Sequence, residues 1–217
     1  MEFVRQREEI VAFGRRMIQR GLAVGTGGNL SIYVRDTGVV LVSPSGMDYD
    51  EIELEDVVVL DPNGKVIEGR RRPSTESPMH LAIYRDRTEI NAVVHTHSPY
   101  ATALACLGRG IPPFHYLVPF IGASVNCAPY ASFGTDELGL AAVQGMAERK
   151  AVLLANHGVL AGDATLRAAF GIAELVEFLS RVYCAARTLD DPRSLPAPEL
   201  VQLGRKFRNY AAGTEKT

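Results

Sequence analysis

Residues 90–97 read INAVVHTH, an apolar and largely β-branched run that ends in two histidines. We expect a strand over residues 90–94, because β-branched side chains pack well on a pleated surface. The two-residue period of a strand then places the side chains of His95 and His97 on one face. The stretch therefore predicts a sheet with a pair of imidazoles at the end of one strand.

Predicted helices and strands alternate on both sides of this stretch. Apolar spacing and turn residues predict helices within residues 2–20, 73–87, 99–107, 135–148, 164–188 and 199–210. Ser77 is a natural N-cap for the second of these helices. Further strands are predicted over residues 29–34, 39–42, 57–60, 65–67 and 151–155.

Some of these strands are joined by hairpins and others are separated by helices. This mixture predicts an α/β fold with three α/β/α layers, in which a mixed central sheet carries helices on both faces. A dinucleotide-binding Rossmann fold is excluded, since no G-x-G-x-x-G motif follows the first strand. With no repeat and no long linker, residues 1–217 are expected to form a single domain.

Composition excludes several classes of protein. The 217 residues are 47% hydrophobic and 22% charged, which excludes a disordered chain. The formal net charge is −2 with no basic stripe, so nucleic acid is not expected as a partner. No apolar run approaches the ~18 residues of a membrane helix, so no membrane partner is expected. Three widely spaced cysteines fit a reducing cytoplasm, where we expect the protein to reside.

A third histidine, His157, follows the apolar run 151–155 within the sequence Asn-His-Gly. Strand ends in layered α/β folds gather around a common crevice, so His157 can join His95 and His97. Three histidines with one open position are typical of a catalytic zinc ion, whereas structural zinc sites have four protein ligands. The alternative interpretation is a set of polar residues that cap strands.

An acidic residue, Glu76, stands just before the helix predicted within residues 73–87. A carboxylate at this position commonly complements the positive end of the helix dipole. The functional alternative is a carboxylate beside the metal, acting as a general base or as a fourth ligand. Spacing alone slightly favours the first interpretation.

Three short segments share a chemistry suited to phosphate: Gly27-Gly28-Asn29, Ser45-Gly46 and Ser74-Thr75. Each offers hydroxyl donors, backbone N–H groups in a turn, or both. Together they could form a nest for a phosphate monoester, although each segment alone is an ordinary turn. No Walker-type lysine accompanies them, which argues against a nucleoside triphosphate.

In this order and spacing the motifs resemble the class II aldolase/adducin-domain family. The resemblance spans residues 5–210 and rests on five segments: GTGGNLS (25–31), SPSG (43–46), PSTE (73–76), HTH (95–97) and NHG (156–158). It implies the three-layer fold and a C4 homotetramer with active sites between subunits. It implies Zn²⁺ held by His95, His97 and His157, with Glu76 as resting ligand and catalytic base.

The resemblance also assigns substrate contacts. It places Thr26, Gly28, Asn29, Ser45, Gly46, Ser74 and Thr75 at phosphate-binding positions. It implies that Tyr116 serves a neighbouring subunit as proton donor. It also implies that Phe133 and Tyr210 shape the aldehyde pocket.

The activity implied by the resemblance is reversible cleavage of a phosphorylated ketose. Within the family the chain most resembles aldolases that cleave L-fuculose 1-phosphate to dihydroxyacetone phosphate and lactaldehyde. Alternatives are 5-deoxyribulose 1-phosphate or methylthioribulose 1-phosphate as substrate, a ribulose-5-phosphate 4-epimerase, or a non-catalytic adducin-like module. The run Leu117–Gly122 is bulkier and more apolar than its counterpart in the fuculose enzymes, which points to a less polar aldehyde.

Overall fold

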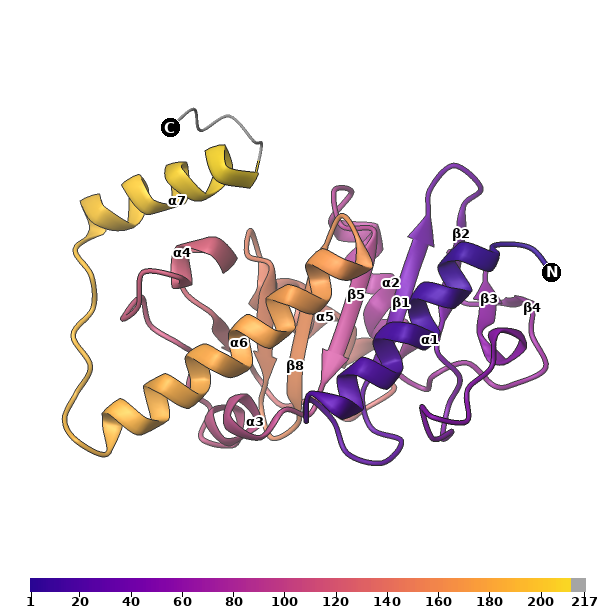
Figure 1. Cartoon of the computed structure of the whole chain (residues 1–217), viewed down its shortest axis with the longest axis horizontal. Helices are drawn as coiled ribbons and strands as arrows, with labels where there is room; N and C mark the ends of the chain where they lie inside the picture. The colour runs from indigo at the N-terminus through magenta and orange to yellow at the C-terminus, as the bar shows by residue number, and fades with distance from the viewer. Residues whose placement is uncertain (212–217) are drawn as a thin grey trace.

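A computed structural model describes residues 1–211 of the chain, without the side chains of residues 208, 210 and 211 (Figure 1). Its centre is one eight-stranded sheet in the order β4-β3-β2-β1-β5-β8-β7-β6. The strands are β1 (Asn29–Val34), β2 (Val39–Val42), β3 (Val58–Leu60), β4 (Val66–Glu68), β5 (Ala92–Thr96), β6 (Asn126–Ala128), β7 (Ala151–Leu154) and β8 (Gly158–Asp163). Neighbouring strands run antiparallel except for the parallel pair β6–β7, so the sheet is mixed as predicted.

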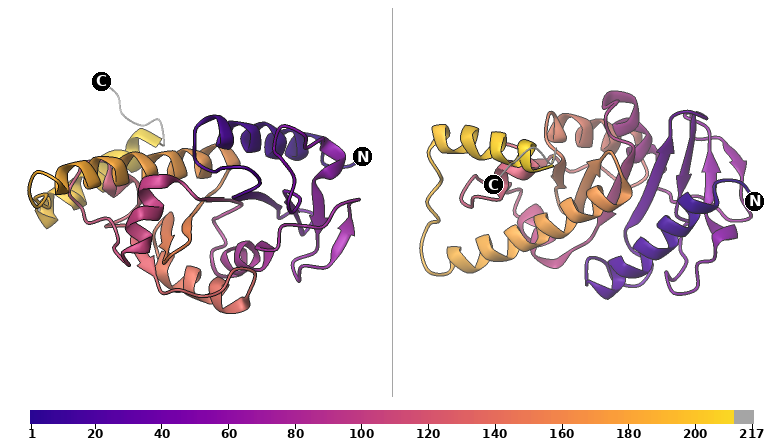
Figure 2. Two further views of the ribbon diagram at one scale, coloured as in Figure 1. Left: turned by 90° about the horizontal axis from the view of Figure 1, so that it is seen from below. Right: turned by 45° about the horizontal axis from the view of Figure 1, so that its top comes forward.

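Helices cover both faces of this sheet. They are α1 (Val4–Gln19), α2 (Ser77–Asp86), α3 (Pro99–Cys106), α4 (Val118–Ile121), α5 (Asp136–Met146), α6 (Leu166–Arg187) and α7 (Ala197–Ala211), with a 3₁₀ turn η1 (Leu54–Asp56). Seen from below, α1 and α6 lie on one side of the sheet and α2 and α5 on the other (Figure 2). The three-layer α/β/α prediction is confirmed.

Each face of the sheet has its own hydrophobic core. On one side, Phe13 of α1 and Phe170 of α6 pack over strand residues such as Val94. On the other side, Met79 of α2 lies against strand residues such as Val93. Because neighbouring strand residues face opposite ways, Val93 and His95 both face the α2 side of the sheet. Strand periodicity thus decides which helix layer meets the histidines.

Several elements differ from the sequence-based predictions. The strands β6 and β8 and the short helix α4 were not predicted. The N-cap of α2 is Glu76, and not Ser77 as predicted, because the Ser77 hydroxyl donates to the Ser74 carbonyl 2.6 Å away inside the preceding turn. Among the described residues no helix is long and apolar enough to cross a membrane.

Candidate metal and catalytic site

Strand register brings the polar residues of β1 and β5 together. Asn29 lies directly opposite His95 in the β1–β5 pair, and Thr96 lies opposite Val159 in the β5–β8 pair. The second pairing places the β7–β8 turn, which carries His157, next to the end of β5. Asn156 adopts φ 56° in this turn, a left-handed conformation that asparagine tolerates better than most residues.

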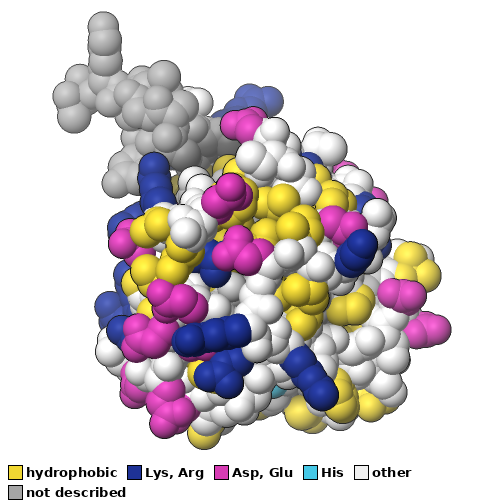
Figure 3. All heavy atoms as spheres, turned by 90° about the vertical axis from the view of Figure 1, so that its right-hand side faces the viewer, with side chains coloured by type: hydrophobic (Ala, Val, Ile, Leu, Met, Phe, Trp, Pro, Cys, Tyr) yellow, Lys and Arg dark blue, Asp and Glu magenta, His cyan; other side chains and the backbone are white. Residues whose placement is uncertain are grey.

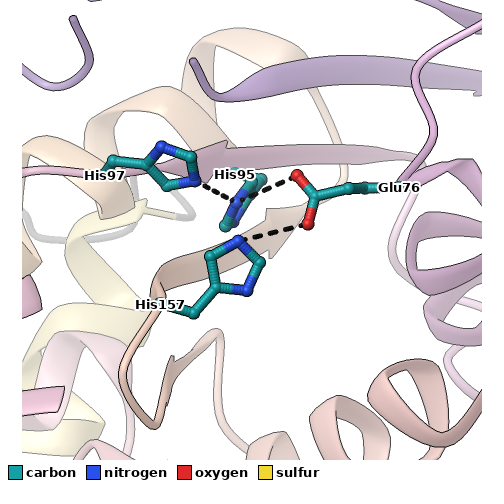
Figure 4. Close-up of side chains that lie close together, drawn as sticks. All are labelled: Glu76, His95, His97 and His157. Carbon is teal, nitrogen blue, oxygen red and sulfur yellow. Dashed lines mark hydrogen bonds and ion pairs between the residues drawn. The ribbon is translucent and has the colours of Figure 1, made fainter. Parts of the chain in front are cut away.

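Four side chains converge where these elements meet the start of α2 (Figure 4). The Nε2 atoms of His95 and His97 are 2.9 Å apart. The two carboxylate oxygens of Glu76 lie 3.3 Å from His95 Nε2 and 3.2 Å from His157 Nε2. One ligand atom from each of these four residues lies within 4.8 Å of the others, so the cluster can hold a metal ion.

The hydrogen bond that holds the His95 ring turns its second nitrogen toward the cluster. His95 Nδ1 lies 2.8 Å from the Val159 carbonyl, which can only accept, so Nδ1 carries a proton. His95 Nε2 is then the ring atom that faces Glu76, 3.3 Å from its nearer oxygen. Three imidazoles with a carboxylate form a typical zinc donor set.

The electrostatics of the cluster keep His97 and Glu76 in the forms that bind metal. Burial and the neighbouring His95 and His157 lower the pKa of His97 from 6.5 to about 4, so its ring is neutral at pH 7. Burial alone would raise the pKa of Glu76, but the adjacent His95 and His157 hold that pKa far below its usual range. A neutral imidazole and an ionised carboxylate are the ligating species.

Glycines leave the space that the cluster occupies. A Cβ on Gly28, whose φ is +72°, would lie 2.8 Å from the His95 carbonyl oxygen. A Cβ on Gly27 would lie 3.0 Å from His97 Nδ1, and one on Gly158 would lie 2.3 Å from the Thr96 carbonyl oxygen. The loops around the histidines therefore require glycine for close approach as well as for conformation.

A family model for the class II aldolase and adducin N-terminal domain matches residues 8–184. The chain belongs to this family. The matched segment contains all four residues of the cluster.

Relatives and solved structures of the class II aldolase family extend the likeness over almost the whole chain. A Bacillus thuringiensis serovar kurstaki protein named 5-deoxy-D-ribulose 1-phosphate aldolase is 51% identical over 95% of this chain and 97% of its own. An Escherichia coli K12 protein named L-fuculose phosphate aldolase is 36% identical over the full length of both chains. A solved structure named L-fuculose 1-phosphate aldolase superposes with a TM-score of 0.93 at 43% identity, covering 96% of this chain and 98% of its own.

The structure brings two of the three predicted phosphate segments into direct contact. An isolated antiparallel bridge joins Pro44 to Pro73, so Ser45 and Ser74, which follow these prolines, lie on adjacent segments. Gly46, with φ +69°, is exposed at the end of the first segment, and Thr75 is exposed at the end of the second. These residues form one hydroxyl- and amide-rich edge beside Glu76, and their contact with phosphate stays a prediction.

The third predicted phosphate segment, Gly27-Gly28-Asn29, contacts Glu76 through Asn29. Thr26 is exposed, whereas the buried Asn29 donates from Nδ2 to a Glu76 oxygen at 2.9 Å. Asn29 therefore orients the carboxylate in this structure. Its predicted contact with phosphate is untested.

A cavity of about 280 Å³ opens onto the cluster. Its lining includes Glu76, His97 and His157 together with Thr75, Tyr130 and Phe133. Phe133 lines this cavity, and its predicted role in shaping an aldehyde pocket stays a prediction. Tyr130 lines the same pocket and was not predicted as a site residue, because an exposed tyrosine in a loop carries no distinctive spacing signal.

Tyr116 and Tyr210 are the two remaining predicted residues. Tyr116 is 54% exposed, and its ring packs against those of His115 and Phe207 at centroid distances of 4.8 and 6.5 Å. It does not line the 280 Å³ cavity of its own chain. The side chain of Tyr210 lies outside the described residues.

A buried polar network adjoins the cluster. Ser31 Oγ lies 2.6 Å from both His80 Nδ1 and the Tyr84 hydroxyl, and His80 is only 1% exposed. His80 is therefore a core histidine. Burial and the neighbouring His95 lower the pKa of His80 from 6.5 to about 3.

This shift predicts a pH dependence of stability. A histidine whose pKa is lower in the folded than in the unfolded chain contributes stability that is complete above pH 6.5 and is lost as pH falls toward 3. We expect His80→Gln to lower the slope of the unfolding free energy against pH by about 1.4 kcal/mol per pH unit between pH 6 and pH 4. Urea unfolding at several pH values tests this, and equal slopes for variant and wild type would contradict it.

Proposed function

We propose that this chain is a zinc-dependent aldolase that cleaves a ketose 1-phosphate to dihydroxyacetone phosphate and a small aldehyde. The observation that carries the proposal is the convergence of three imidazole nitrogens on the carboxylate of Glu76 at the mouth of a cavity. Family membership supports it, since relatives at 36% and 51% identity are named as aldolases of sugar phosphates.

In this proposal His95, His97 and His157 hold the metal, with Glu76 as the additional ligand of the resting site. Imidazole ligands suit zinc among the divalent first-row metals. When bound, the ion supplies the Lewis acidity that stabilises negative charge on the ketone fragment during C–C cleavage.

Glu76 is the proposed general base. In the synthetic direction its carboxylate takes the proton from C3 of dihydroxyacetone phosphate, and in cleavage it returns that proton to C3. Asn29 supports this role because it donates to one carboxylate oxygen of Glu76. This hydrogen bond restricts the rotation of the carboxylate group. The phosphate edge at Ser45 and Ser74 holds the substrate so that C3 lies within reach of Glu76.

Tyr116 is proposed to act in the site of a neighbouring subunit of a C4 homotetramer. Its ring is half exposed and is held by Phe207 of α7, a helix that lies against α4 at one end of the molecule (Figure 1). There its hydroxyl would protonate the alkoxide of the aldehyde fragment during synthesis and accept that proton during cleavage.

Removing the Tyr116 hydroxyl separates the two proton transfers. We expect Tyr116→Phe to lower the rate of ketose cleavage by about 10²-fold, while exchange of the C3 proton of dihydroxyacetone phosphate with solvent is nearly unchanged. Cleavage is measured with a coupled assay and exchange by NMR in D₂O. An equal loss of both rates would assign Tyr116 a different role.

The favoured substrate is 5-deoxyribulose 1-phosphate, which would yield acetaldehyde when its C3–C4 bond breaks. The 51% identical relative carries that name, and the apolar run Leu117–Gly122 suits an aldehyde without a hydroxyl. L-Fuculose 1-phosphate is the second candidate, supported by the solved structure with a TM-score of 0.93.

A panel of four ketose phosphates tests this choice: 5-deoxyribulose, fuculose, ribulose and methylthioribulose 1-phosphates. We expect the highest kcat/KM for 5-deoxyribulose 1-phosphate. A higher value for fuculose 1-phosphate would instead favour the lactaldehyde-forming reaction.

A further inference from the structure

Three consecutive arginines precede the phosphate edge, and two of them are already paired. Arg70 and Arg71 each donate from Nε to the same oxygen of the buried Asp56, at 2.9 and 2.8 Å. Despite burial, these two guanidinium groups lower the pKa of Asp56 to about 2. Arg72 is exposed, and within the described residues no carboxylate forms an ion pair with it.

The backbone places Arg72 beside the phosphate edge. Ser45 N donates to the Arg72 carbonyl at 2.9 Å, and Ser74 N donates to the Ser43 carbonyl at 3.1 Å. These two bonds flank the Pro44–Pro73 bridge, so Ser45 is the cross-strand partner of Arg72.

Side chains of paired residues in antiparallel strands lie on the same face, and so do those of residues two apart along a strand. By this register Arg72 and Ser74 lie on the same face of their segment, and Ser45, the first residue of the following turn, lies opposite Arg72. On the side of the molecule that carries β3 and β4, basic and acidic side chains are interspersed over the surface (Figure 3).

A phosphate at this edge has a charge that the nearby donors do not balance. The hydroxyls and backbone amides around Ser45 and Ser74 are neutral, and the carboxylate of Glu76 lies close by. A guanidinium offers paired N–H donors whose spacing matches phosphate oxygens.

We propose that Arg72 is a further substrate-binding residue, whose guanidinium pairs with the phosphate of the sugar phosphate. This inference rests on the proposed function, because it takes a phosphorylated ketose as the substrate. Arg72 adds charge recognition to an otherwise neutral edge, and it acts on binding rather than on bond cleavage.

Arg72→Gln removes this charge, and Arg71→Gln is its matched control. The control removes the same charge one residue away, and Arg70 still pairs with Asp56. We expect Arg72→Gln to raise about tenfold both the KM for 5-deoxyribulose 1-phosphate and the inhibition constant of inorganic phosphate. Its kcat should stay within about twofold of wild type, Arg72→Lys should retain part of the affinity, and Arg71→Gln should change neither constant.

Unchanged constants in Arg72→Gln, or an equal rise in Arg71→Gln, would overturn the proposal. Titration calorimetry with inorganic phosphate on the metal-loaded protein measures the same contact without turnover. If no ketose phosphate is cleaved, the proposed function fails, but the titration still decides the role of Arg72. A wild-type protein that binds no phosphate, or variants that bind it equally well, would refute the role of Arg72.

Discussion

Replacing Glu76 by Gln is expected to leave a folded protein that still binds zinc but has lost about 10³-fold in kcat, a typical contribution of a general base. The amide keeps the size of the side chain and one oxygen, while His95, His97 and His157 remain as ligands. It cannot accept the proton from C3. Steady-state cleavage together with the zinc content of the purified variant measures both parts of this prediction.

The matched control is Glu8→Gln, which makes the same chemical change on the exposed side of α1. The control should retain wild-type activity and zinc. Near-normal turnover in Glu76→Gln would remove Glu76 as the base. Loss of zinc along with activity would show that the carboxylate is needed mainly as a ligand.

Loss of one histidine ligand is expected to have the second large effect. His157 lies in the β7–β8 turn and is partly exposed, so its truncation to Ala leaves the hydrophobic core intact. Loss of a residue that only hydrogen-bonds to a metal ligand can lower the metal affinity by ~100-fold. Because His157 is itself a proposed ligand, we expect a larger fall in zinc affinity, and activity should fall with it. Competition with a chelator measures the affinity.

His115→Ala is the control for this variant, because His115 packs against Tyr116 and lies outside the four-residue cluster. It should keep the zinc affinity of the wild type. If His157→Ala also bound zinc normally, the three-histidine site would be wrong, and the convergence of these rings would need another explanation.

Local patterns in the sequence were sufficient for six of the eight strands and for grouping His95, His97 and His157. The run before His95 predicts a buried strand, and the strand period brings His95 and His97 together, as the 2.9 Å separation of their Nε2 atoms confirms. His157 could be added because it directly follows an apolar strand. Neither inference required knowledge of distant contacts.

Features that depend on tertiary pairing were missed. The strand β8 begins and nearly ends with glycine, and it forms only because β5 and β7 flank it. The three-residue β6 depends likewise on pairing with β7. Ser77 has the right chemistry for an N-cap, but it lies inside the first turn of α2, where its hydroxyl donates to the Ser74 carbonyl.

The edge at Ser45 and Ser74 that is proposed to bind phosphate shows the same difference between local and tertiary information. The serines and glycines that form it could be identified from their residue types. Arg72 could not be distinguished from Arg70 and Arg71 until the structure paired those two with Asp56 and placed the Pro44–Pro73 bridge beside the third. A run of like charges reads as a solvated loop unless the partners of each charge are known.

In the proposed reaction, a metal held by three histidines supports cleavage of a ketose 1-phosphate. This can be followed by ³¹P and ¹H NMR of the zinc-loaded protein with 5-deoxyribulose 1-phosphate, before and after addition of a chelator. We expect equal amounts of dihydroxyacetone phosphate and acetaldehyde, formation that stops with the chelator, and recovery when zinc is restored. Unchanged product formation in metal-stripped protein, or no dihydroxyacetone phosphate from any ketose 1-phosphate of the panel, would contradict it.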